Sequence, residues 1–271
     1  MNGGLLYRSM RETELVCAIC CTTIFLFEAL VTYVFWTYQE EFTGDFLQIE
    51  FFKNIINSMV GSRMGGDIGP STLQSLAWVH PIVLSVFFVQ AITSSTRVPA
   101  GEIDAGTADI LLALPVSRWS IYVHETLVWL MSGFLIATFA MLGNRFGNLF
   151  VPAEGRVAVE RVFIILGNLF ALYVCVGAIS SFLTARANSR GRAVGGAVGI
   201  LLTFLMWNFI GQYWGPAEKF EFLNILTYYR PMPILDEGTV PWRDMAVLAT
   251  LSGILWGLGG VYFHRRDINT L

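Results

Sequence analysis

Residues 101–118, GEIDAGTADILLALPVSR, form the stretch around which the rest of the chain is organised. The stretch is polar and acidic, and it separates two long apolar runs. Glu102 and Asp104 lie where a helix N-terminus favours negative charge, and Pro115 ends the helical pattern. Five residues recur at steps of three and four and would form one mostly apolar face of a helix: Ile103, Thr107, Ile110, Leu111 and Leu114. We therefore expect one short amphipathic helix on the membrane surface, able to dock against a soluble partner.

The composition of the whole chain is that of a membrane protein. Of its 271 residues, 55% are hydrophobic and 14% are charged, whereas soluble proteins average about 25% charged residues. The net charge of −3 argues against nucleic acid as a partner. Six apolar runs are each long enough to cross a bilayer as a helix. We predict an all-α integral membrane protein with a single domain, residues 1–271, and spans at about 16–38, 73–95, 119–142, 159–184, 193–214 and 245–263.

Several spaced elements of residues 101–118 resemble the coupling region of type-2 ATP-binding-cassette exporter permeases: Gly-Glu, Gly-Thr, a leucine-rich turn and Pro-Val-Ser-Arg. In that family the segment between the second and third spans presses into the nucleotide-binding subunit. The resemblance implies a six-span permease that forms the substrate pathway of an ATP-driven exporter. It also implies that the ATPase subunit is contacted by Glu102, Ile103, Asp104, Gly106, Thr107, Leu111, Leu112, Pro115, Val116, Ser117 and Arg118.

Four of these residues receive a specific expectation. Gly106 is expected where docking needs a close approach of the backbone, because it has no side chain. Leu111 and Leu112 are expected to fill an apolar groove on the ATPase. Arg118 is expected to anchor the end of the helix at a lipid headgroup or on an acidic partner residue.

The chain has no nucleotide-binding motif of its own. No G-x-x-x-x-G-K-[ST] sequence occurs, and the only lysines, Lys53 and Lys219, follow no glycine-rich turn. We therefore expect no cofactor in this chain, with ATP and Mg²⁺ bound by a separate ATPase subunit. Because six spans form half of a transporter in the family that the chain resembles, two ATPase subunits and a second permease, identical or related, are implied.

Two amphipathic segments flank the first span. Residues 4–15 oppose apolar to charged side chains, which predicts an N-terminal helix lying at the membrane interface. In the loop at 39–72, Leu47, Phe51, Ile55 and Met59 repeat every four residues and predict a helix on the outer membrane face.

Two stripes of small residues mark the last two spans. Gly191, Gly195 and Gly199 recur every four residues in the fifth span. Ala249, Gly253 and Gly257 repeat the spacing in the sixth. Such stripes let the backbone of another helix approach closely. We favour packing within one bundle over a seam between two permeases.

Two ionisable residues are candidates for the transport pathway. Glu28 falls near the middle of the first span, where an ionisable side chain faces the bundle interior or a wet cavity. A structural, hydrogen-bonded role is an equal alternative for it. His80 precedes Pro81, which should bend the second span, and is either a proton carrier or a hydrogen-bonding anchor. Cys17 and Cys21 share a helix face and could bind a soft metal, but packing is favoured, so no metal site is predicted.

Other classes of protein fit the sequence less well. A proton-coupled secondary transporter could use Glu28 and His80, but such transporters normally carry inverted repeats, and none is visible. A permease-like subunit that serves maturation or signalling is a variant of the main hypothesis. Neither G-x-S-x-G nor H-E-x-x-H occurs, so no catalytic residue is assigned.

The density of arginine in short loops sets the orientation. Both termini in the cytoplasm of a bacterial or archaeal cell place these basic residues inside: Arg8, Arg11, Arg97, Arg118, Arg186, Arg190, Arg192, Arg265 and Arg266. The same orientation brings residues 101–118 to the side where ATP is found.

Cysteines introduced in the loop at 39–72 should therefore react with a membrane-impermeant maleimide on intact cells, because the loop lies outside. Cysteines introduced at 186–192 should react only after permeabilisation. Labelling of the 39–72 loop that requires permeabilisation would contradict the predicted topology.

Overall fold

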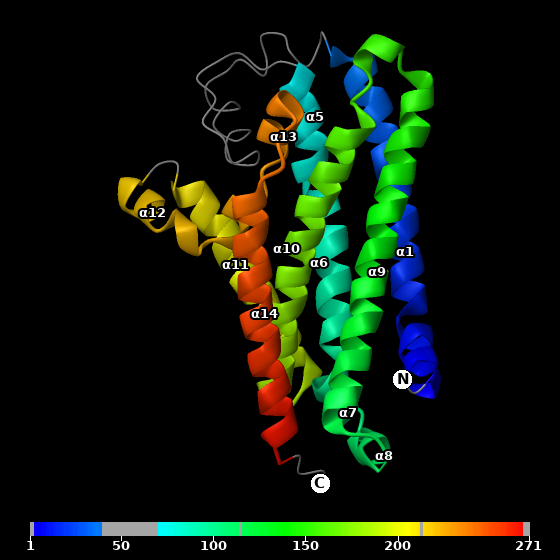
Figure 1. Ribbon diagram of the computed structural model, residues 1–271, viewed down its shortest axis with the longest axis vertical. Helices are drawn as coiled ribbons and strands as arrows, with labels where there is room; N and C mark the ends of the chain where they lie inside the picture. The colour runs from blue at the N-terminus through cyan, green and yellow to red at the C-terminus, as the bar shows by residue number, and fades with distance from the viewer. Residues whose placement is uncertain (1–2, 40–69, 114, 212–213, 268–271) are drawn as a thin grey trace.

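A computed structural model describes residues 3–39, 70–113, 115–211 and 214–267, and in these ranges the regular elements are helices, with no strand (Figure 1). The predicted helix on Leu47 to Met59 lies outside the described residues. In chain order the α-helices are α1 (Gly3–Thr37), α5 (Pro70–Val79), α6 (Pro81–Ser95), α7 (Glu102–Asp104), α8 (Ala108–Leu112), α9 (Arg118–Gly147), α10 (Val159–Arg186), α11 (Arg190–Gly211), α12 (Gly215–Lys219), α13 (Pro231–Glu237) and α14 (Trp242–Arg265).

Within the described ranges, six segments are long and apolar enough to cross a membrane, which confirms the predicted all-α architecture and its number of spans. The start of α1, the end of α14 and the short helices α7 and α8 lie at one end of the bundle (Figure 1). We call this the terminal end, and we call the opposite end, near α5 and α13, the distal end. The six segments are Leu6–Thr37, Leu73–Ser95, Arg118–Phe150, Ala153–Arg186, Arg190–Gly211 and Trp242–Arg265.

The bundle is built around α6 and α10. Helix α6 packs against α1, α9 and α10, and α10 packs against α9, α11 and α14. Helices α1 and α9 pair along one side, while α14 follows α10 on the other (Figure 1). The side chains of Phe87, Trp129 and Tyr173 are buried in the core. Tyr173 Oη donates to the carbonyl of Trp129 at 2.6 Å, so this buried phenol is satisfied.

Helix α1 is continuous from Gly3 to Thr37, so the separate interfacial helix predicted for residues 4–15 is wrong. Within those residues no proline breaks the helix, and one buried face runs through Ser9, Thr13 and Cys17 into the span. A helix of this length is about 52 Å long, against about 30 Å for the hydrocarbon core of a bilayer. The first turns of α1 therefore extend the first span beyond the hydrocarbon rather than lying flat.

The second span breaks at His80, as Pro81 predicts. α5 ends at Val79 and α6 begins at Pro81. His80 caps α6, because its Nδ1 accepts a hydrogen bond from the backbone N–H of Ile82 at 3.2 Å. The imidazole also lies on the ring of Phe27 of α1, with centroids 4.7 Å apart. The structure thus uses His80 as a hydrogen-bonding anchor of the bend.

The connection between α11 and α14 is a folded part of the distal end. Asn224 Oδ1 accepts from the N–H of Leu226, and its Nδ2 donates to the carbonyl of Phe204. Tyr229 Oη donates to the carbonyl of Trp78 in α5 at 3.0 Å. These bonds let polar backbone groups enter the core without being left unpaired.

The two stripes of small residues point away from the bundle, so the prediction that they pack within it is wrong. A Cβ added at Gly191, Gly195 or Gly199 would meet no atom within 4 Å, and the same holds at Gly253 and Gly257. The close approaches occur at other glycines. A Cβ at Gly143 of α9 would lie 2.4 Å from the carbonyl oxygen of Phe25 in α1. Spacing alone predicts that a stripe exists but not which surface covers it.

Gly143→Ala should therefore destabilise the protein by about 1 to 3 kcal/mol, because the added methyl group meets backbone that must shift. The matched control is Gly253→Ala, where the space is open and removing a helical glycine gains up to about 1 kcal/mol. The thermal unfolding midpoint of each purified variant in detergent gives the comparison. Equal midpoints would contradict the close packing of α1 on α9.

Candidate coupling site

The segment between α6 and α9 contains a helical turn at Arg97–Gly101 followed by two short α-helices, α7 and α8, rather than the one amphipathic helix that was predicted. Gly106, with φ at 68°, ends α7 in the left-handed conformation. The N–H of Thr107 donates to the carbonyl of Glu102 at 2.9 Å, and the N–H of Gly106 donates to that of Ile103 at 3.1 Å. This pair of bonds is the Schellman motif, which requires a residue that tolerates positive φ. Nothing lies within 4 Å of a Cβ at Gly106, so the glycine provides a turn, not a close approach within the chain.

A buried arginine joins this segment to the rest of the bundle. Arg97 follows α6 and is 8% exposed. Its guanidinium forms ion pairs with Glu12 of α1 and Glu125 of α9. Its Nη2 also donates to Ser9 Oγ at 2.6 Å, and Ser9 donates in turn to Glu125. One guanidinium therefore binds two helices that are far apart in sequence.

Glu102, at the start of α7, extends this cluster into the coupling segment. Its Oε1 accepts from Arg8 of α1 at 2.7 Å and lies 3.8 Å from Arg97 Nη1. Its Oε2 accepts from Thr107 Oγ1 at 2.5 Å, across the turn at Gly106. The Glu102 side chain is only 6% exposed, so the residue expected to touch a partner is instead inside the protein. We name Arg8, Glu12, Arg97, Glu102 and Glu125 the ion cluster.

The sequence contained a partial signal for the ion cluster. Each member lies at the terminal-end margin of an apolar run, and six spans place those margins on the same side of the bundle. Which of these residues pair depends on which helices are neighbours, and the spacing of residues within a single apolar run does not predict that.

Residues 108–118 divide between the protein interior and its surface. Leu111 is 5% exposed and packs in a small apolar cluster with Val98, Ile121 and Phe263. Leu112 is half-buried against the same cluster. The expectation that these leucines project into a partner's groove is therefore wrong for Leu111. The side chain that does project is Ile110, which is 68% exposed.

The end of the segment is fixed to the last helix. Ser117 caps α9 by accepting from the N–H of Ser120 at 3.1 Å. Arg118 Nη1 donates to the carbonyls of Phe263 and Arg266 at the C-terminal end of α14. Arg118 thus satisfies carbonyls that a helix end leaves unpaired, in place of the headgroup or partner contact expected for it. Val116 is half-buried, while Pro115 is exposed beside it.

The side chains exposed at the tip of this segment form one surface. Asp104 lies at the end of α7, and Asp109 and Ile110 lie in α8. We call this the coupling tip. It is acidic around one large apolar side chain, and its backbone is held from behind by the ion cluster and by Leu111.

Glu28 and His80 lie apart from the coupling site. Glu28 is fully buried, and its two carboxyl oxygens have no hydrogen-bond partner among the described residues. Neither residue lines any of three hollows, which lie where α1, α5 and α9 converge, between α6 and α11, and between α1 and α9. The four cysteines are free and buried, and within the described ranges no group of three His, Cys, Asp or Glu side chains is arranged to hold a metal ion.

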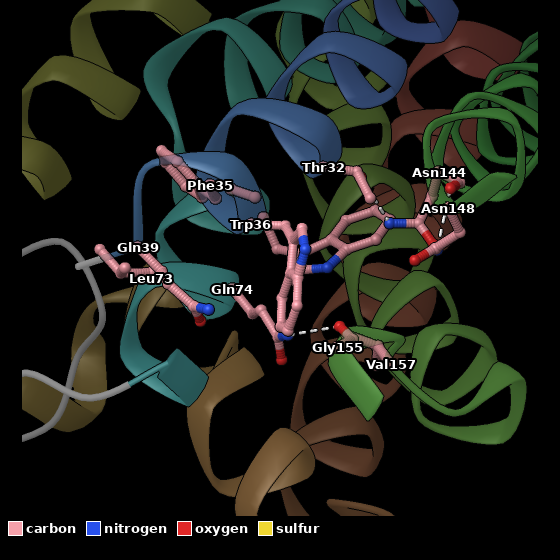
Figure 2. A pocket seen from close by; sticks show the side chains of 12 residues that line it. Thr32, Phe35, Trp36, Gln39, Leu73, Gln74, Asn144, Asn148, Gly155 and Val157 are labelled. Atoms are coloured by element: carbon pink, nitrogen blue, oxygen red, sulfur yellow. Dashed lines mark hydrogen bonds between the residues drawn. The ribbon is translucent and has the colours of Figure 1, made fainter. Parts of the chain in front are cut away.

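Two hollows lie nearer the distal end. Figure 2 shows the first, of about 40 Å³, where α1, α5 and α9 converge. Its walls combine aromatic side chains such as Phe35 and Trp36 with polar groups, where Gln74 donates to the carbonyl of Gly155 and Asn144 donates to Thr32. The hollow therefore has room for water rather than for a substrate. The second, of about 200 Å³, lies between α6 and α11. Its lining combines apolar and polar side chains, including Ser85, Phe88, Asn208 and Tyr229.

Arg97→Met should destabilise the protein by about 3 to 5 kcal/mol, because it leaves buried carboxylates without their cation. Arg192→Met, at an exposed position of α11, is the matched control and should leave stability unchanged. Thermal unfolding midpoints in detergent check both variants. Equal midpoints for the two would show that the ion cluster does not hold the terminal end together.

Comparison with known proteins gives one match. Residues 17–268 match a protein family described as "ABC-2 family transporter protein". No curated protein and no solved structure matches the chain.

Proposed function

The chain belongs to the ABC-2 family of transporter proteins and is a membrane permease of an ABC transporter, and from this premise we propose that it exports its substrate by coupling to a separate ATPase subunit through the coupling tip. The proposal rests on the coupling segment of residues 101–118. The apolar side chain of Ile110 is exposed in this segment, and contacts with α1, α9 and α14 hold the backbone of the segment in place.

The coupling tip has the chemistry of a small docking surface. Ile110 is large, apolar and 68% exposed, beside the acidic residues Asp104 and Asp109. Burying such a side chain in a partner's pocket contributes about 1.5 to 3 kcal/mol. We expect the ATPase to offer an apolar pocket with a basic rim. Leu112 and Val116 pack against the apolar cluster of Leu111 beneath the tip, and Pro115 is exposed beside them.

The ion cluster is the means by which movement of the tip reaches the spans. Glu102 is adjacent in the chain to the tip and binds Arg8 of α1, while Arg97 binds Glu12 of α1 and Glu125 of α9. A push on the tip is therefore applied to α1 and α9 together. Only a difference in contact between the two nucleotide states of the ATPase can drive such a change.

The complete exporter in this proposal contains two copies of the ATPase, which bind ATP and Mg²⁺, and a second permease, identical or related. We place the second permease against α11, where Gly191, Gly195 and Gly199 face outward and leave room for another backbone. The assembly sits in the cell membrane with both termini in the cytoplasm. The hollow between α6 and α11 then faces the partner permease and is the proposed substrate contact.

A proton-driven transporter receives less support from the structure. His80 is used as a helix cap, and Glu28 lines none of the three hollows. A pathway through these residues would have to cross the packed core around them.

Ile110→Ser should lower capture of the ATPase by about 10-fold or more, because the apolar side chain at the interface is lost. The control is Leu149→Ser at the distal end, where the leucine is equally exposed, at 68%. Co-purification of the ATPase from native membranes with each tagged permease measures the effect.

Recovery of the ATPase with wild type and with Leu149→Ser, but not with Ile110→Ser, is the expected result. Absence of any ATPase with the wild-type chain would overturn the proposed function. Equal recovery with both variants would overturn the placement of the contact at Ile110.

A further inference from the structure

A large hollow lies between the first half of α1 and the middle of α9, while further along the same two helices pack closely at Phe25 and Gly143. Its volume is about 1080 Å³, several times that of the α6–α11 hollow. The wall from α1 runs from Tyr7 to Thr22, and the wall from α9 runs from Val128 to Phe139. Phe170 of α10 closes the back. The hollow is not part of the coupling site or of the proposed substrate contact.

The side chains that line the inner part of the hollow are mostly apolar. Met131, Phe134, Leu135 and Phe139 line the α9 side, and Ala18 lies opposite on α1. Fifteen helical steps from Tyr7 to Thr22 span about 22 Å. One leaflet of hydrocarbon is about 15 Å deep, and its headgroup region adds several more. The length of this hollow, which we call the α1–α9 groove, therefore matches the length of one acyl chain and its headgroup.

Charge is confined to the terminal-end mouth of the groove. Arg11 and Glu14 both line it and are both exposed. Arg11 donates to Tyr7 Oη at 3.0 Å, which holds the guanidinium at the mouth. A cation and an anion three residues apart on a helix lie on the same face. They complement a headgroup that carries a phosphate and an ammonium group.

We propose that the α1–α9 groove is a binding site for a membrane phospholipid with an ammonium headgroup, such as phosphatidylethanolamine. The acyl chain lies between Ala18 and Leu135, the phosphate meets Arg11, and the ammonium meets Glu14. The lipid comes from the leaflet at the terminal end. This site rests only on membrane insertion of the chain, and it stands independently of the coupling to an ATPase.

A transmembrane helix is a poorer occupant of this groove. Helices approach one another in membranes through small residues, whereas the α9 wall is built from large flexible and aromatic side chains. Large apolar walls suit a thin, conformationally adaptable chain. The charges of both signs at the mouth also lie at headgroup depth, where a lipid brings its own charges.

The test uses the purified full-length chain in vesicles of phosphatidylethanolamine and phosphatidylglycerol. A trace of phosphatidylethanolamine with a diazirine on its acyl chain is photolysed, and the labelled peptides are mapped by mass spectrometry. Ala18→Trp fills the groove, and Ile19→Trp, at the adjacent exposed residue outside the lining, is its matched control. Leu135→Trp fills the groove from the α9 side and decides the matter if Ala18→Trp does not fold.

The expected result is labelling within residues 7–22 and 128–139 in wild type and in Ile19→Trp, with at least a fivefold loss in the groove-filling variant. Labelling of α14 serves as the reference for bulk lipid. Equal groove labelling in all variants overturns the site.

A second comparison tests the headgroup. Glu14→Gln should abolish a preference for the phosphatidylethanolamine probe over a phosphatidylglycerol probe. Equal labelling by both probes in wild type overturns the assignment of the headgroup.

Discussion

The guanidinium of Arg97, buried between carboxylates from two helices, is the interaction on which the terminal end of this protein depends. A buried charge is costly unless it is paired and hydrogen-bonded, and Arg97 meets that requirement only when α1 and α9 both lie beside it. The cluster combines two arginines with three glutamates from α1, α7 and α9 and the turn before α7. Arg8 and Glu12 pair within α1, but Arg97, Glu102 and Glu125 find their charged partners only on other elements, so the cluster defines how these elements sit together.

The distal end is held by a different kind of bond. Asn144, Asn168, Asn224 and Tyr229 donate there to backbone carbonyls or to the hydroxyl of Thr32. Arginine side chains at this end donate mostly to backbone carbonyls, as Arg161 does to that of Leu235. The terminal end, where both chain termini lie, carries the ion cluster and the exposed coupling tip, whereas the distal end carries the folded connection over the core.

The fold class and the number of spans follow from the sequence for a physical reason. Backbone groups in a bilayer have no water to bond, so each long apolar run must satisfy them internally as a helix. The bend at Pro81 follows as well, because proline lacks the N–H that a continuous helix needs. Residues 101–118 likewise predicted the family, because the motif elements that carry the resemblance lie close together in the sequence. These features depend on residues close together in the chain.

Only the tertiary structure decided which way each side chain points and which helices lie next to one another. Periodicity in residues 101–118 predicted one helix face, but Gly106 takes a positive φ, which rotates the second half and turns Leu111 inward and Ile110 outward. The glycine stripes were visible, yet their spacing is the same whether a helix covers them or not. Arg97 and Glu12 are separated by 85 residues, and their pairing exists only because α1 and α6 pack together. A local pattern determines which element forms, whereas the packing of the whole bundle determines what each face of that element meets.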